Sequence, residues 1–261
     1  MEKLLKTFDN KKYQKLAIDN QKAYKKNKPF PHIYFDNFLP KELALSLFKD
    51  YPKINKIDRN WKIHKNQNVT RFMLEDSSLF KKNLKLFSML TNSRKFLLFL
   101  ETLTGLDSII PDPYFVGGGA MTTGSGGFLN VHADFNFHHK LQSWRRLNVL
   151  FYLTPNWKKK WGGKLELWSK NKKKKITEID PIFNRVVVFN TNSETFHGQP
   201  IPVTCPKNIY RNVFSVFYYS NIKDKKSLSD PHYTKYSIKN NPYAKKYLMI
   251  IKKMIIRTDM K

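Results

Sequence analysis

The spacing of hydrophobic positions changes near residue 111, and this change predicts helices before it and strands after it. Before residue 111, apolar residues recur at helical spacing between polar and lysine-rich positions. The pattern predicts helices within 1–28, at about 43–51, at 79–90 and at 93–104, with a short strand at 32–35. The last helix ends at Gly105, a residue typical of helix C-termini.

After residue 111, short runs rich in Val, Phe, Tyr and Leu alternate with turn residues. Such runs are typical of antiparallel strands in a double sheet or barrel. The predicted strands are 114–116, 127–133, 147–153, 164–168, 176–179, 186–190 and 213–219. Helices followed by many strands indicate the α+β class.

The C-terminal region has a different pattern. Residues 221–241 read as a polar connector, and apolar residues return at helical spacing between lysines over 242–257. We expect a basic amphipathic helix there. It would either dock on the core or attach to an anionic membrane surface.

Composition excludes several classes of protein. Of 261 residues, 41% are hydrophobic and 15% aromatic, which is enough for a real core. The single cysteine, Cys205, excludes an internal disulfide scaffold and a four-cysteine zinc site. No apolar run reaches the ~18 residues of a membrane span, and the charged N-terminus does not resemble a signal peptide. We therefore expect a cytoplasmic protein.

The net charge of +28 comes mostly from lysine, since only 8 of the 48 basic residues are arginine. Lys, Asn, Ile and Phe share AT-rich codons, so genome composition can produce this balance. The functional alternative is a polyanion partner or an anionic membrane contact through the lysine-rich surface. The shortage of arginine counts against bidentate readout of bases or phosphates. The densest run, Lys170–Lys175, is predicted to be a solvated hairpin tip.

Two residues of one predicted strand carry metal-binding chemistry. His132 and Asp134 are two positions apart, so both side chains lie on one face. His197, which follows the predicted strand 186–190, is the best candidate for a second imidazole. Two histidines and a carboxylate form the facial triad of non-haem Fe(II) oxygenases. A strand-edge ion pair is the alternative for His132 and Asp134.

Arg211 opens the last predicted strand, fourteen residues after His197. A buried arginine at this position can bind the distal carboxylate of a 2-oxoacid bidentately. The alternative role is a salt bridge at the end of the strand.

The order of several motifs resembles the prolyl-4-hydroxylase-type branch of the 2-oxoglutarate/Fe(II) dioxygenases over residues 29–220. The matching stretches are PFPHIYFDNFLP (29–40), PDPYFVGGG (111–119), GGFLNVHADFN (126–136), RRLNVLFYLTPNW (145–157), GGKLELW (162–168), FNRVVVFNTNSETFHGQPIP (183–202) and RNVFSVFYYS (211–220). The resemblance implies a double-stranded β-helix, or jelly-roll, core over 111–220. Helices within 29–110 would support this core, with 1–28 as a helix and connector and 221–261 as a C-terminal extension.

The resemblance also implies site residues. The positions that match the family's iron ligands are His132, Asp134 and His197. Those that match its 2-oxoglutarate pocket are Arg211, Tyr152 and Asn148. Tyr152 can alternatively be a core tyrosine. Where the family often has Arg-x-Ser, this chain has Val213, so one hydroxyl contact to the carboxylate is expected to be missing.

The implied activity is hydroxylation of an unactivated C–H bond with Fe(II), 2-oxoglutarate and O₂, with ascorbate as a reductant in vitro. The resemblance adds no catalytic side chain beyond the metal centre. A prolyl residue of a protein or peptide is the substrate to which it points. The same chemistry on a glycan, a lipid-linked sugar or a small metabolite is an alternative, and a polyanion-binding module on the same scaffold is another.

Candidate substrate contacts follow the ligand pair along the chain. They are Phe135, Asn136, His138 and Trp168. His138 and its neighbour His139 can alternatively be exposed loop residues, and Trp168 can be a packing residue.

Overall fold

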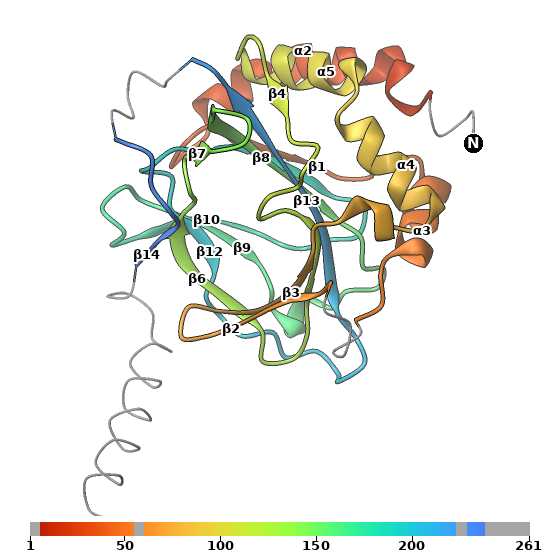
Figure 1. The fold of residues 1–261 in the computed structure, drawn as a ribbon, viewed down its shortest axis with the longest axis vertical. Coiled ribbons are helices and arrows are strands. Elements are labelled where there is room, and N and C mark those ends of the chain that lie inside the picture. Colours follow the sequence, from red (N-terminus) through yellow and green to blue (C-terminus); the bar gives the residue numbers. More distant parts are fainter. Residues whose placement is uncertain (1–5, 55–59, 223–228, 238–261) are drawn as a thin grey trace, which may run out of the picture.

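The computed structural model describes residues 6–54, 60–222 and 229–237, and Figure 1 shows their arrangement. Four α-helices lie within these ranges: α2 (Lys11–Lys26), α3 (Lys41–Asp50), α4 (Lys82–Thr91) and α5 (Arg94–Thr104). Short 3₁₀ turns are η1 (Thr7–Asp9), η2 (Ser77–Leu79) and η3 (Lys159–Trp161). The Ser93 hydroxyl caps α5, and Gly105 ends it at φ 70°, as the sequence predicts.

The described strands form one antiparallel sheet of fourteen strands. They are β1 (His32–Phe35), β2 (Lys62–Lys65), β3 (Val69–Leu74), β4 (Ile110–Pro111), β5 (Gly119–Thr123), β6 (Phe128–Ala133), β7 (Phe137–His138), β8 (Ser143–Tyr152), β9 (Leu165–Trp168), β10 (Lys175–Ile179), β11 (Val186–Asn190), β12 (His197–Gln199), β13 (Arg211–Ser220) and β14 (Lys235–Tyr236). Hydrogen-bonded neighbours run in the order β1-β11-β8-β13-β5-β3-β6-β12-β9-β10. Four short strands pair beside this series: β2 with β3, β4 with β13, β7 with β8, and β14 with β6.

The sheet curls so that distant strands face one another across a buried interior. Met121 of β5 and Val213 of β13 share one apolar cluster with Leu167 of β9 and Ile179 of β10. The curl is that of a double-stranded β-helix, and it confirms the predicted α+β jelly-roll fold. The interior between the facing strands is where a site can be enclosed.

The outer face of β8 and β13 is covered by helices, which gather at the top and right in Figure 1. Phe151 of β8 lies with its ring centroid 5.0 Å from that of Phe87 in α4 and 6.1 Å from that of Phe96 in α5. Alternate residues of β8 therefore serve two cores, because neighbouring side chains of a strand point to opposite faces. Leu150 and Tyr152 point inward, whereas Val149 and Phe151 face the helices.

One predicted strand is wrong, and others were not predicted. Residues 114–116 form a turn, because the Asp112 carboxylate accepts hydrogen bonds from the backbone N–H groups of Tyr114 and Val116, at 2.8 and 2.9 Å. The sequence pattern also missed β2, β3, β4, β5, β7, β12 and β14. The residues of β2 are mostly polar, β5 is rich in Gly and Thr, and β4, β7, β12 and β14 have only two or three residues each.

The lysine run and the C-terminal region can be compared with their predicted structures. The lysine run 170–175 forms the predicted turn between β9 and β10, and a polyanion contact there stays a prediction. The predicted helix over 242–257 lies outside the described residues. Part of the predicted connector, residues 229–237, contributes β14 to the edge of β6. None of the helices in the described ranges is long and apolar enough to cross a membrane.

Candidate metal centre

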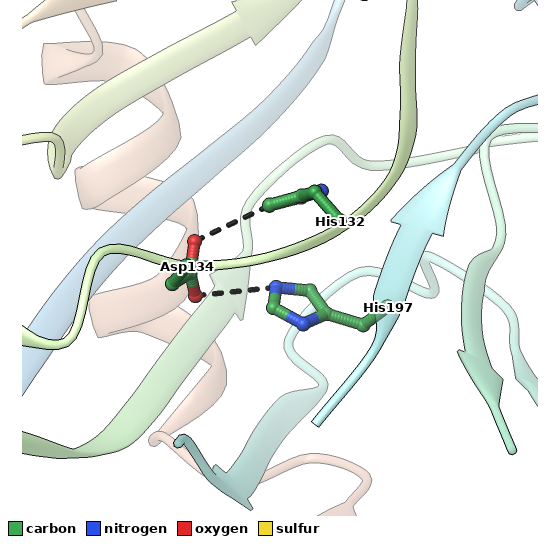
Figure 2. Close-up of side chains that lie close together, drawn as sticks. All are labelled: His132, Asp134 and His197. Atoms are coloured by element: carbon green, nitrogen blue, oxygen red, sulfur yellow. Dashed lines mark hydrogen bonds and ion pairs between the residues drawn. The ribbon is translucent and has the colours of Figure 1, made fainter. Parts of the chain in front are cut away.

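Two neighbouring antiparallel strands place the predicted triad. His132 lies on β6, Asp134 directly follows that strand, and His197 opens β12. In the pairing of β6 with β12, His197 is the direct partner of His132. Figure 2 shows both imidazoles turned toward the Asp134 carboxylate. The structure therefore brings together the three residues that the sequence selects.

The distances within the triad leave room for one shared ion. The Nε2 atom of His132 lies 3.2 Å from Asp134 Oδ1, and that of His197 lies 3.3 Å from Oδ2. The potential ligand atoms of all three residues lie within 4.8 Å of one another. Among the residues that the structure describes, this is the one cluster of three or more His, Cys, Asp or Glu side chains with such geometry.

Backbone carbonyl groups orient both imidazoles. His132 Nδ1–H donates to the Asn130 carbonyl oxygen at 2.8 Å, and His197 Nδ1–H donates to that of Thr195 at 3.1 Å. A carbonyl oxygen only accepts, so each Nδ1 carries a proton, and each Nε2 is the ring atom turned toward the centre as a potential metal ligand. Burial, with a smaller effect of the neighbouring His197, lowers the pKa of His132 and favours the neutral imidazole that a metal requires.

The Asp134 carboxylate is held in its charged form. Burial by itself would raise its pKa, but Arg145, His197 and hydrogen bonds from both histidines outweigh burial and lower the pKa well below its usual range. Arg145 Nη2 lies 3.1 Å from Asp134 Oδ2, and Asn148 Nδ2–H donates to the same oxygen at 2.8 Å. An ionised carboxylate beside two imidazoles whose Nε2 atoms face it fits Fe(II) in a facial triad.

A second set of polar atoms lines the same cavity. Tyr152 Oη and Arg211 Nε are buried and have no hydrogen-bond partner among the residues that the structure describes. The other guanidinium nitrogens of Arg211 donate to the Gly163 carbonyl oxygen at 2.9 Å and to Gln199 Oε1 at 3.1 Å. Unpaired buried donors are costly unless an acceptor fills the space between them. A carboxylate such as the distal one of 2-oxoglutarate fits this pair of donors.

Asn148 also lines the cavity, as predicted, but its hydrogen bonds are made to the metal ligand Asp134 and to Arg145. Its amide nitrogen donates to Asp134, while its Oδ1 atom accepts from Arg145 Nε at 3.0 Å and from Nη2 at 2.7 Å. In the structure Asn148 thus orients Asp134. Its predicted role toward 2-oxoglutarate stays a prediction.

Two arginines and a glutamine of the cavity were not selected from the sequence. They are Arg71 of β3, Arg145 of β8 and Gln199 of β12. Arg145 is only 3% exposed and stacks over the Phe217 ring, with its Cζ 3.4 Å from the ring centroid. A charged residue at the start of a strongly apolar strand is the signal that could have identified it.

The predicted substrate contacts do not line this cavity. Phe135 packs against the Arg145 guanidinium, and Asn136 hydrogen-bonds to the segment 229–232. His138 is 3% exposed and lies with Nε2 3.5 Å from Asp112 Oδ1, so it is neither a cavity residue nor an exposed loop histidine. Trp168 packs beside Val131, Ala133 and Phe196.

Comparison with known proteins identifies the family. Residues 118–219, which include the triad and Arg211, match the family model described as the 2OG-Fe(II) oxygenase superfamily. Residues 118–219 of the chain therefore form a domain of the 2OG-Fe(II) oxygenase type. The chain is accordingly an enzyme of the dioxygenase class, and its His-Asp-His site fits iron. No curated protein matches the chain in a sequence comparison.

Two solved structures share the fold of this oxygenase. A prolyl hydroxylase from Trichoplax adhaerens, solved in complex with a hypoxia inducible factor oxygen degradation domain peptide fragment, superposes with a TM-score of 0.58 at 19% identity. The superposition covers 80% of this chain and 91% of that one. A prolyl-4-hydroxylase from Pseudomonas putida gives a TM-score of 0.54 at 15% identity, covering 80% of this chain and 98% of that one. Both confirm the jelly-roll architecture.

Proposed function

We propose that this oxygenase hydroxylates a prolyl residue of a protein or peptide in the cytoplasm. The observation that carries the oxygenase chemistry is the meeting, in one cavity, of the His132–Asp134–His197 triad with the unpaired donors of Tyr152 and Arg211. The prolyl substrate is supported by the fold shared with two prolyl hydroxylases. The cytoplasmic setting accords with the single, unpaired thiol of Cys205.

The residues of the chain have distinct tasks in this reaction. His132, Asp134 and His197 would hold Fe(II), and Arg211 with Tyr152 would hold the distal carboxylate of 2-oxoglutarate. When bound, these two groups supply the oxidation of a C–H bond by O₂, coupled to conversion of 2-oxoglutarate to succinate and CO₂. Arg145 and Asn148 keep Asp134 charged and oriented. The apolar walls formed by Leu150, Leu165 and Phe189 limit the entry of water.

The test is formation of succinate from 2-oxoglutarate under air with Fe(II) and ascorbate, in the presence of proline-containing peptides. Wild-type protein should add one oxygen atom to a prolyl residue, detected by mass spectrometry, and Asp134→Ala should lose this activity. Failure of the wild type to bind either Fe(II) or 2-oxoglutarate would contradict the proposal.

A further inference from the structure

A third arginine faces the cavity that holds the triad. Arg71 lies on β3, which hydrogen-bonds to both β5 and β6, and lines the cavity together with Arg145 and Arg211. These are three of the eight arginines in a chain whose basic residues are otherwise lysine. Asp134 is the one carboxylate among the described residues that line the cavity.

The other two arginines have acceptors suited to a guanidinium, but within the described part of the chain Arg71 has none. Arg145 pairs with Asp134 and Asn148, and Arg211 donates to Gly163 and Gln199. For Arg71, the contact in the structure is from Nη1 to the Met121 sulfur at 3.6 Å, and a thioether is a weak acceptor. Its Nε atom is shielded from solvent and has no hydrogen-bond partner in residues 6–54, 60–222 and 229–237. A shielded guanidinium without an anion is costly, which is typical of a site that a ligand completes.

The reaction's own cofactors do not supply this anion. Fe(II) carries two positive charges and 2-oxoglutarate two negative ones, so together they leave the charge of the cavity unchanged. The cavity then keeps three guanidinium groups against the single carboxylate of Asp134. A further negative group is needed for electrostatic complementarity, and the primary substrate is the remaining component that can bring it.

Arg71 also lines the same cavity as the metal ligands His132, Asp134 and His197, so its guanidinium can meet a substrate that enters there. Tyr236 of β14 pairs in register with His132, and their ring centroids are 5.6 Å apart. Tyr236 therefore lies beside the triad, and Arg71 lines the cavity into which the triad faces.

We propose that Arg71 binds a carboxylate of the primary substrate, close to the carbon that is hydroxylated. This inference rests on the oxygenase chemistry of the proposed function and assigns a carboxylate to its substrate. The carboxylate can belong to an acidic residue next to the proline of a peptide or to a free amino acid such as proline. Both sources present the same group to the same guanidinium, in a charge-assisted hydrogen bond.

Matched pairs of ligands test the proposal. The first pair is N-acetyl-Gly-Pro-Asp-amide and its Asn counterpart, and the second is L-proline and L-prolinamide. Binding is measured anaerobically by calorimetry, with Zn(II) in place of Fe(II) and with saturating 2-oxoglutarate. Turnover with Fe(II) is measured separately. We expect one carboxylate ligand to bind about 10- to 100-fold more tightly than its amide, and the pair that shows this preference identifies the source of the carboxylate.

Substitution of the arginine then assigns the preference to its side chain. Arg71→Met should abolish the preference while 2-oxoglutarate affinity stays within about twofold, and Arg71→Lys should restore part of it. Arg94→Met, on the exposed start of α5, is the matched control and should retain the full preference. Equal affinities within both pairs in the wild type, including no binding at all, would overturn the proposal, as would weaker 2-oxoglutarate binding in Arg71→Met. Loss of 2-oxoglutarate binding in the wild type itself would instead contradict the proposed function.

Discussion

His197 lies directly opposite His132 in the antiparallel pair of β12 and β6, and their ring centroids are 4.5 Å apart. The register of the two strands therefore places the two histidine ligands of the metal centre side by side. A slip of one residue would turn one imidazole to the other face of the sheet. Asp134, just beyond the end of β6, completes the set with one carboxylate oxygen near each ring.

Removal of Asp134 should abolish metal binding. With Zn(II) or anaerobic Fe(II) at about 100 times its dissociation constant, the wild type should gain about 2.7 kcal/mol of stability and a higher thermal midpoint. Asp134→Ala should show no gain relative to its own metal-free midpoint, and Asp107→Ala, at an exposed position, should behave as the wild type. Without metal, Asp134→Ala should also be less stable than the wild type, because Arg145 loses its buried partner. A full metal-induced shift in Asp134→Ala would remove this residue from the ligand set.

Gly163 should control 2-oxoglutarate affinity through Arg211. A Cβ atom at Gly163, where φ is +81°, would lie 2.9 Å from Arg211 Cδ and displace the guanidinium. Gly126 has φ +78° with nothing within 4 Å of its Cβ position, so Gly126→Ala has the same backbone cost without the clash. We expect the KM for 2-oxoglutarate to rise about tenfold or more in Gly163→Ala and to change little in Gly126→Ala. Equal KM values in both variants would show that Arg211 is not displaced.

The fold was predictable where local sequence and tertiary burial agree. The run Val186–Asn190 is β11 residue for residue, because both of its faces are buried between cores and its apolar run is unbroken. The helix that starts after Ser93 and ends at Gly105 has both of its caps in the sequence. By contrast, β12 has only three residues, one of them glycine, and it exists because β6 and β9 lie on either side of it.

The site was predictable where residue type alone indicates the chemistry. His132, Asp134 and His197 stand out because few side chains bind metals. Arg71 and Arg145 do not stand out, because the importance of a buried guanidinium depends on what the fold places around it. For Arg145 the partner is Asp134, eleven positions earlier in the chain and across a loop. The burial of His138 was not predicted for the same reason, since its partner Asp112 lies far from it in the chain.

The helical support should contribute strongly to stability through Phe96. This side chain is fully buried in α5, with its ring centroid 5.7 Å from that of Phe99 and 6.1 Å from that of Phe151 on β8. We expect Phe96→Ala to lower the free energy of unfolding by about 3–5 kcal/mol, measured by urea denaturation. Met89→Ala, at a side chain 59% exposed on α4, should change it by less than about 0.5 kcal/mol. Similar losses in the two variants would contradict the packing role of α5.

His32 should make stability depend on pH. Burial lowers its pKa below 6.5, and the hydrogen bond from Nδ1–H to the Phe30 carbonyl oxygen at 2.9 Å offsets only part of this effect. The unfolded chain then binds the proton more readily than the folded chain, so stability is lost as pH falls below about 6.5 and regained above it. Metal-free His32→Gln should lose less stability than the wild type between about pH 7.5 and about pH 5. Exposed His139→Gln should keep the wild-type slope, and an unchanged slope in His32→Gln would contradict the assignment.

Asn136 should fix the segment 229–237 against the edge of the metal centre. Its amide nitrogen donates to the Asp230 carbonyl oxygen at 3.0 Å, and its Oδ1 accepts from the His232 backbone N–H at 2.8 Å. The same segment carries Tyr236, the register partner of His132. Asn136→Ala removes both hydrogen bonds, each of which contributes about 0.5–1.5 kcal/mol. Amide exchange across 229–237 should therefore become about 10-fold faster or more, because opening of this segment costs less free energy.

Asn171→Ala, in the exposed turn between β9 and β10, should leave that exchange unchanged. Wild-type exchange across 229–237 in Asn136→Ala would show instead that the β14–β6 pairing alone holds the segment over His132.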